Sequence, residues 1–191
     1  MTKVAVLLEN RFLDQEIVYY QHRFAEAGID VDFLTRLWGQ PSLTFTGLEL
    51  GLKVEVDKSF ENLDDDALDE YGAVIVPSGY VADQLLYAEK PGDLSPAAQL
   101  VQRLMGRPHI LKAAICHSLW LWTPIPQHLN GRRVTCHNNV VGSVTNTGAV
   151  YTDQDIVVDG DLVTARTGGM FAGLAKTVIE RLATIETKDL N

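Results

Sequence analysis

Residues 4–34 read VAVLLENRFLDQEIVYYQHRFAEAGIDVDFL, and this stretch decides the fold class. Its first five residues, Val4 to Leu8, form a continuous apolar run, which is typical of a strand buried on both faces of a parallel sheet. Apolar residues then recur at near-helical spacing after Asp14, a predicted N-cap, and Gly28 stands where a helix-ending glycine belongs. Ile29–Leu34 completes a β-α-β unit, whose right-handed crossover predicts an α/β sheet.

The rest of the chain extends this pattern. Further elements are predicted as strands at residues 71–76, 111–115 and 132–136, a hairpin or edge strands at 46–57, a hairpin at 156–164, a helix at 96–105, a short helix after residue 116, and a final helix that starts after Gly168-Gly169 and ends near Leu182. We find no repeat or linker, so we expect one domain over residues 1–191, an α/β sandwich with a mostly parallel central sheet.

Charge and cysteine content narrow the function classes. Sixteen Lys and Arg against 25 Asp and Glu give a net charge of −9, which disfavours binding to nucleic acids or anionic membranes. No apolar run approaches a membrane span, and the N-terminal run is too short for a signal peptide. Two cysteines suggest a reducing compartment. We therefore expect a cytoplasmic protein whose partner is a small-molecule substrate, not a nucleic acid or a membrane.

The sharpest chemical motif is AAICHS at residues 113–118, where a predicted strand turns into a predicted helix. This is the pattern of a nucleophile elbow with Cys116 in place of serine. Such a corner lifts the sulfur above the sheet edge, and a helix N-terminus there would lower the thiol pKa below ~8.5. The N–H of His117 would face a developing oxyanion. The alternative is an inert thiol at the end of a core strand.

Three other residues are candidates for the same site. His117 is the candidate general base or thiolate partner, or else a surface histidine. Glu16 follows the first strand, whose carboxyl end lies at the same sheet edge, so its carboxyl group is a candidate partner of the sulfur; the alternative is that it only complements the helix dipole. Gly79 follows the strand at 71–76 and is either a second oxyanion donor or a turn glycine that permits a positive φ.

A metal site and a disulfide are the remaining alternatives for the cysteines. Cys116-His117 and Cys136-His137 suggest zinc, but adjacent side chains point apart and the usual ligand spacings are two to four residues. A Cys116–Cys136 disulfide is disfavoured in a reducing cytosol. We therefore expect no metal and no other cofactor.

Several motifs, in order over nearly the full length, resemble the ThiJ/PfpI superfamily, also called DJ-1/PfpI, and most closely its PfpI branch. They are FLDQEIVY at residues 12–19, VIVPSG at 74–79, AICH at 114–117, the Asp159-Gly160 hairpin and the last helix. The resemblance implies a flavodoxin-like three-layer sandwich of the class I glutamine amidotransferase type. It also implies a homodimer or a larger homo-oligomer.

The resemblance also implies roles for individual residues. Cys116 would be the nucleophile and Glu16 the carboxyl partner of its sulfur, with an oxyanion hole formed by the N–H groups of Gly79 and His117. In the PfpI branch, a triad is proposed from the cysteine, the next histidine and a glutamate of a neighbouring subunit. Glu89 matches that glutamate by spacing. His137 and Ser78 fall at positions that line the pocket.

The implied function is that of a cysteine-nucleophile enzyme acting on a small carbonyl or amide compound through a covalent thio-adduct. Family chemistries include a glyoxalase-like conversion and amidase- or peptidase-like hydrolysis. The alternative is a redox-sensing or stress-protective protein that uses an oxidisable Cys116. A regulatory ligand-binding domain is a third class.

Three departures from the family pattern concern the site. Ser78 replaces the first glycine of the turn after the strand at 71–76. Ser118-Leu119-Trp120 stands where Gly-Pro is usual, which narrows the pocket or changes its floor. Leu13 replaces an acidic residue, so the site is less acidic than that of its relatives.

Overall fold

The computed structural model describes residues 2–189, and a seven-stranded sheet runs through its centre. Its strands are β1 (Lys3–Leu7), β2 (Asp30–Thr35), β5 (Lys58–Ser59), β6 (Tyr71–Val76), β7 (Leu111–Ile115), β10 (Ile156–Asp159) and β11 (Leu162–Ala165). They lie in the order β10-β11-β7-β6-β1-β2-β5, and β10 alone runs antiparallel to its neighbour. The mostly parallel sheet predicted from the sequence is confirmed.

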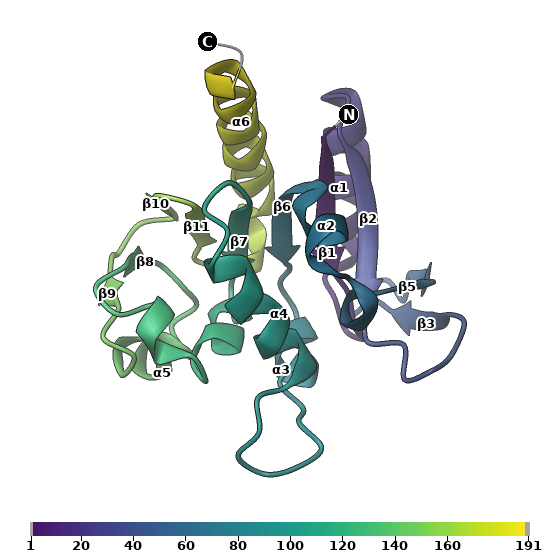
Figure 1. Ribbon diagram of the computed structural model, residues 1–191, viewed down its shortest axis with the longest axis horizontal. Helices are drawn as coiled ribbons and strands as arrows, with labels where there is room; N and C mark the ends of the chain where they lie inside the picture. Colours follow the sequence, from purple (N-terminus) through teal and green to yellow (C-terminus); the bar gives the residue numbers. More distant parts are fainter. Residues whose placement is uncertain (1, 190–191) are drawn as a thin grey trace.

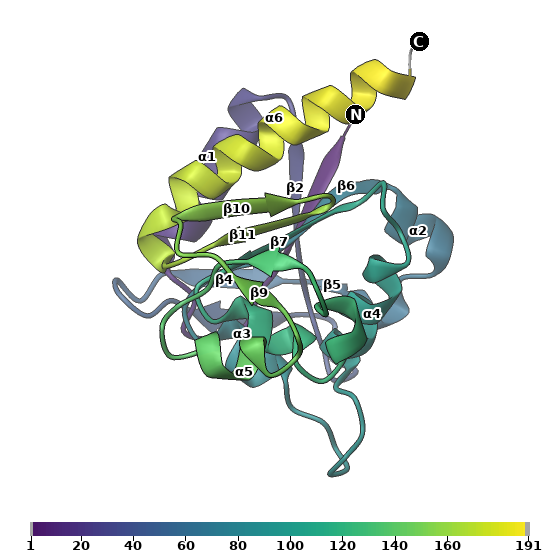
Figure 2. The same cartoon turned by 90° about the vertical axis from the view of Figure 1, so that its left-hand side faces the viewer.

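Helices cover both faces of the sheet (Figures 1 and 2). On one face α1 (Asp14–Glu26) packs against α6 (Phe171–Asp189), and α6 also contacts β6, β7 and β11. On the other face lie α2 (Asp65–Asp69) and α4 (Pro96–Met105), with the short α3 (Val81–Leu85) near the carboxyl ends of the strands. The three-layer sandwich is thereby confirmed. No helix within residues 2–189 combines the length and apolarity needed to cross a membrane.

Two small sheets lie outside the central one. The hairpin or edge strands expected at 46–57 correspond to a hairpin that begins earlier: β3 (Leu43–Thr46) ends where the predicted stretch begins, and β4 (Lys53–Val56) lies within it. The strand expected at 132–136 is reduced to β8 (Arg133–Val134), which pairs with β9 (Val150–Tyr151) near α5 (Val141–Thr145). It ends early because the next residues turn towards the central sheet: the N–H of Thr135 donates to Thr164 Oγ1, and that of His137 donates to the Cys116 carbonyl.

The start of α1 and the end of α6 differ from the sequence prediction. Asp14 is not the N-cap of α1, because Leu13 holds that position without a side-chain hydrogen bond. The Asp14 carboxylate instead accepts the N–H groups of Glu49 and Leu52, each at 2.7 Å, and so fixes the turn between β3 and β4. The last helix continues past Leu182 as far as Asp189.

Strand β7 carries the features that matter for function. All five of its residues are buried, including Lys112, whose side chain is 1 % exposed. Lys112 Nζ lies 2.6 Å from Asp161 Oδ2 and 2.6 Å from the Arg107 carbonyl oxygen. This ion pair joins the amino end of β7 to Asp161, the residue before β11. The carboxyl end leads directly into Cys116.

Candidate active site

The chain turns sharply at Cys116, as the elbow motif predicts. Cys116 has a φ of +64°, a left-handed conformation that is strained for a residue with a side chain. Two backbone hydrogen bonds hold it there: its N–H donates to the Ala165 carbonyl at 3.0 Å, and its carbonyl accepts the N–H of His137 at 3.0 Å. The neighbouring strand end and the segment after β8 therefore fix the corner.

The short helix expected after the corner is present as a 3-10 helix, Ser118–Trp122. The buried Ser118 hydroxyl lies 2.7 Å from the Pro77 carbonyl and 2.6 Å from the Ile115 carbonyl, both of which it can donate to. It thus links the ends of β6 and β7. A single short 3-10 turn has fewer aligned peptide dipoles than an α-helix, so it contributes less to stabilising a thiolate at Cys116.

The electrostatics of the thiol also differ from the expectation. Burial raises the pKa of Cys116 above its ordinary value, although hydrogen bonding from the backbone N–H groups of Gly168 and His117 acts in the opposite direction. The negative charges of Glu16 and Asp83 raise it further. The protonated thiol is therefore the dominant form near neutral pH, and a base must take its proton when it attacks.

Glu16 is the buried carboxyl group whose charge acts on this thiol. It is fully buried at the start of α1. Its Oε1 accepts the Tyr20 hydroxyl at 2.7 Å, and its Oε2 accepts both the N–H of Ser78, at 2.9 Å, and the Ser78 hydroxyl. Burial raises the pKa of Glu16 to about 7 in spite of these donors. The carboxyl group can therefore take up or release a proton at neutral pH, which general acid–base catalysis requires.

The turn after β6 brings Ser78 to Glu16 and depends on Gly79. Gly79 has a φ of +86°, and a Cβ there would lie 2.3 Å from the Arg11 carbonyl oxygen. It pairs with Phe12 in an isolated bridge. Only glycine fits this close approach of two backbones. The predicted pocket residue Ser78 is thus a hydrogen-bond partner of the carboxyl group.

Gly168 is a site residue that the sequence analysis missed. Its N–H hydrogen-bonds to the Cys116 sulfur. A Cβ at Gly168 would lie 2.8 Å from Leu13 Cδ2 and 3.1 Å from Ser78 Oγ, so a larger residue would press on the site. The Gly168-Gly169 pair in the sequence could have indicated this close approach of the backbone to the site, but it was used only to predict the start of the last helix.

His117 lies in a cluster of rings beside the elbow. Its centroid is 5.0 Å from those of both Trp120 and His137, and 6.3 Å from that of Tyr80, which it meets edge-on. Burial lowers its pKa, although the charge of Asp83 raises it, so the ring is neutral at pH 7. His117 Nδ1 lies 3.8 Å from Asp83 Oδ2, and neither atom has a hydrogen-bond partner within residues 2–189. Sequence reasoning missed Asp83, which lies on α3 just after the Gly79 turn.

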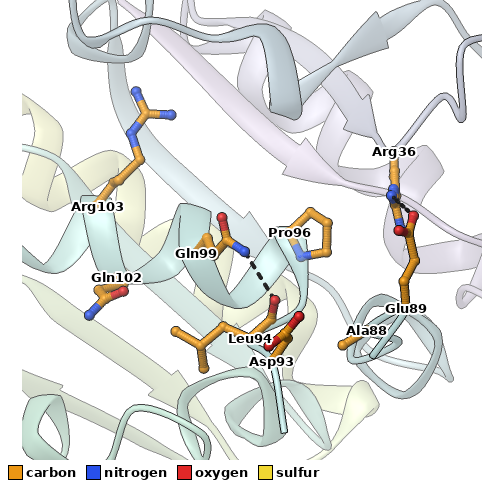
Figure 3. A pocket seen from close by; sticks show the side chains of 9 residues that line it. All are labelled: Arg36, Ala88, Glu89, Asp93, Leu94, Pro96, Gln99, Gln102 and Arg103. Carbon is orange, nitrogen blue, oxygen red and sulfur yellow. Dashed lines mark hydrogen bonds and ion pairs between the residues drawn. The ribbon is translucent and has the colours of Figure 1, made fainter. Parts of the chain in front are cut away.

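Glu89 lies apart from this cluster. It is in the loop between α3 and α4, which projects from the body of the molecule (Figures 1 and 2). Its side chain is 64 % exposed and accepts a hydrogen bond from Arg36 at 2.7 Å. Both line a hollow of about 620 Å³ with Pro96 and Gln99, as Figure 3 shows, and no predicted site residue except Glu89 lines it. A role for Glu89 in a neighbouring subunit's site, within a homo-oligomer, stays a prediction.

The two cysteines are both free thiols. Cys136 is completely buried, and burial raises its pKa to about 12. Among the side chains that the structure describes, those of residues 2–185, no three His, Cys, Asp or Glu form a group that could hold a metal ion. The structure thus brings together Cys116, His117, Glu16, Ser78, Gly79 and His137 at one sheet edge.

Comparison with known proteins places these features in a family. The model of the DJ-1/PfpI family matches residues 2–181. The chain is 30% identical over 179 residues to a deglycase of Thermococcus kodakarensis, and 28% identical over 179 residues to the deglycase PfpI of Pyrococcus furiosus. Each alignment covers 92% of this chain and 97% of the relative.

A solved structure shows the same fold. It is a two-domain protein from Anabaena variabilis with DJ-1/ThiJ/PfpI-like and ferritin-like domains, similar to this chain with a TM-score of 0.82 and 26% identity. The likeness covers 96% of this chain and 48% of that one, so this chain spans about half of the two-domain protein. The flavodoxin-like architecture implied by the family resemblance is confirmed. Because the family model matches residues 2–181, nearly the whole chain, the chain belongs to the DJ-1/PfpI family.

Proposed function

We propose that the chain is a cysteine-dependent enzyme that acts on small carbonyl compounds. The observation that carries this is Cys116 at a strained corner together with the fully buried Glu16, whose charge raises the thiol pKa and whose own pKa of about 7 suits proton transfer at neutral pH. Relatives at 28% and 30% identity are named deglycases, a name that denotes removal of a glycation group, and this supports carbonyl-derived substrates.

The first step is addition of the thiol to a carbonyl carbon. The Cys116 sulfur forms a bond to that carbon while the carbonyl π electrons move to oxygen. The thiol proton passes to the Glu16 carboxylate and from there to the new oxyanion, giving a hemithioacetal. Because burial raises the thiol pKa, this proton leaves during the attack and not before it. The N–H of Gly79 is a candidate donor to the oxygen.

The second step depends on the substrate. With a 2-oxoaldehyde, Glu16 or His117 takes the proton from the carbon that carries sulfur and returns it to the neighbouring carbon, while the hydroxyl proton on the first carbon moves to the oxygen of the second. This leaves a thioester, which water hydrolyses to a 2-hydroxy acid and the free thiol. The two carbons exchange oxidation levels, so the reaction needs no external oxidant or reductant. With an amide, the adduct at Cys116 would instead expel the amine.

Turnover of methylglyoxal to lactate by purified variants tests this proposal. We expect Cys116→Ala to lose activity by about a thousandfold or more, and Glu16→Gln by about a hundredfold. Cys136→Ala is the matched control, because it removes the other thiol and leaves the corner intact. Full turnover without Cys116 would overturn the mechanism. Release of amines from glycated peptides by the same variants tests the deglycase form of the reaction.

A redox-sensing role is the alternative, and the half-buried position of Cys116 beside a carboxyl group favours it, because that group can hydrogen-bond a sulfinate. The raised thiol pKa acts against it, since the thiolate is the species that oxidises. Measuring the intact mass of the protein after treatment with a modest peroxide concentration distinguishes the redox sensor from the enzyme. A stable gain of about 32 Da, two oxygens, at Cys116 favours the sensor.

A further inference from the structure

Arg11 is built into the same backbone arrangement as the Gly79 turn. It lies between β1 and α1 with a φ of +63°, a strained conformation for an arginine. Its N–H donates to the Thr46 carbonyl at 2.8 Å, and its own carbonyl accepts the N–H of Tyr80 at 3.1 Å. The position of the Arg11 side chain is therefore tied to the turn that shapes the candidate active site.

The Arg11 guanidinium group carries an unpaired charge at this edge. Its central carbon lies 4.0 Å above the ring of Tyr80, and that ring meets His117. Among residues 2–185, whose side chains the structure describes, no carboxylate lies within ion-pair distance of Arg11, whereas Arg36 and Arg107 each contact two. An exposed arginine without a carboxylate partner is notable in a chain with a net charge of −9.

The contact with Tyr80 does not use the N–H donors of the guanidinium group in an ion pair. Its central carbon lies over the ring, and a guanidinium group can bind a carboxylate through two parallel hydrogen bonds. The other charges near the elbow come from Glu16 and Asp83, which repel anions, and His117 is neutral. Arg11 therefore provides the positive charge that would draw an anion to this site.

We propose that Arg11 is an anion-binding subsite of the Cys116 site, so that the enzyme prefers small carbonyl compounds that carry a carboxylate. This inference deepens the proposed function and rests on it, because a substrate preference requires that Cys116 act on a substrate. The carboxylate would bind the Arg11 guanidinium group while the carbonyl carbon lies at the sulfur. Arg11 is a specificity-determining residue here and takes no part in the bond changes.

Two alkylating reagents of the same shape test the subsite. Iodoacetate is anionic and iodoacetamide is neutral, and peptide mass spectrometry gives the rate of each at Cys116. We expect Arg11→Gln to lower the ratio of the iodoacetate rate to the iodoacetamide rate about fivefold at low ionic strength. Arg11→Lys, which keeps the charge, retains most of the ratio.

The control removes the same charge elsewhere. Arg23 lies in the last turn of α1 and pairs with Glu26 at 3.8 Å, so Arg23→Gln changes the net charge equally without touching the site. It should leave the ratio unchanged. The proposal is overturned if Arg11→Gln slows both reagents equally, or if Arg23→Gln lowers the ratio as much.

A binding measurement separates this inference from the proposed function. Titration with acetate, which does not react with thiols, should shift the backbone amide NMR signals of Gly79, Tyr80 and His117 saturably, and acetamide should not. The acetate shifts should weaken at least about fivefold in apparent affinity in Arg11→Gln. If Cys116 reacts with neither reagent, the proposed function fails while the acetate titration still decides the subsite. Equal acetate binding by the wild type and Arg11→Gln overturns it.

Discussion

The two ends of strand β7 place buried ionisable groups in opposite environments. At the amino end, the side chain of Lys112 is 1 % exposed and contacts Asp161 at 2.6 Å. At the carboxyl end, beyond Cys116, the hydrogen-bond donors to the buried Glu16 are the neutral groups of Tyr20 and Ser78. A full counter-charge keeps a buried pair ionised and holds the strands together, whereas neutral donors leave a carboxyl group that exchanges its proton near pH 7.

The backbone conformation also differs between the two ends of β7. Lys112 lies in a regular ladder, paired with Leu162 of β11 and Val74 of β6. Cys116 has a positive φ, and the turn opposite it needs a glycine. Stability is thus concentrated at one end of the strand, and strain at the other end, where the chemistry is proposed.

The largest expected effect comes from breaking the ion pair at the amino end. Asp161→Ala leaves Lys112 buried with an uncompensated charge, so we expect a loss of about 3–5 kcal/mol in the free energy of unfolding, measured by urea denaturation. Adding Lys112→Met should recover part of the loss, because an apolar side chain tolerates burial. The activity of the folded fraction should not change. A loss below about 1 kcal/mol would mean that this end does not stabilise the sheet.

The next effect compares two glycines that share a positive φ. A Cβ at Gly79 would meet the Arg11 carbonyl oxygen, whereas a Cβ at Gly51, with a φ of +70°, meets nothing within 4 Å. We expect Gly79→Ala to cost about 2–4 kcal/mol of unfolding free energy and to abolish turnover. Gly51→Ala should cost about 1 kcal/mol and leave turnover unchanged. Equal costs at the two positions would show that the close approach at Gly79 is unimportant.

The sequence predicted those parts of the molecule that depend on local pattern. Apolar runs located β1, β6 and β7, and the helix at 96–105 has the predicted bounds. The corner at Cys116 followed from the change of pattern at the end of a strand. The position of Glu16 at the same sheet edge as this corner also followed, because the carboxyl ends of parallel strands share one edge.

The remaining features depend on tertiary contacts that no local pattern records. Asp83 and Gly168 come from separate elements, and only the folded chain brings them to Cys116 and His117. The direction of the thiol pKa was wrong because burial outweighs the short 3-10 turn that follows the corner. Lys112 was treated as part of an apolar strand, because its partner Asp161 lies 49 residues away.

The third prediction tests the proton on Glu16. Its pKa is 4.5 in a model peptide and about 7 in the fold, so the folded protein binds this proton more tightly than the unfolded chain. Wild-type stability therefore falls as the pH rises from about 4.5 to 7, and Glu16→Gln lacks this loss. We expect the stability difference, variant minus wild type, to increase by about 2–3 kcal/mol between pH 4 and pH 8. A difference independent of pH would contradict the raised pKa.

The smallest effect concerns Ser78, whose hydroxyl donates to the Glu16 carboxylate. A donor stabilises the ionised form, so Ser78→Ala should raise the Glu16 pKa further, by about half a unit to one unit. If Glu16 acts as the base, kcat/KM rises with pH along its ionisation, and the variant's profile moves to higher pH by the same amount. Tyr20→Phe removes the donor to the other oxygen and should move the profile in the same direction.

Ser118 gives the matched control, because it is as buried as Ser78, at 1% exposure, but its hydroxyl lies against the carbonyls of Pro77 and Ile115. Ser118→Ala removes a hydrogen bond of similar strength without touching the carboxyl group. It should lower stability by about 1 kcal/mol and leave the pH profile in place. If both serine variants move the profile equally, the shift reflects a general loosening of the strand ends, and the control of the Glu16 proton by neutral donors would not hold.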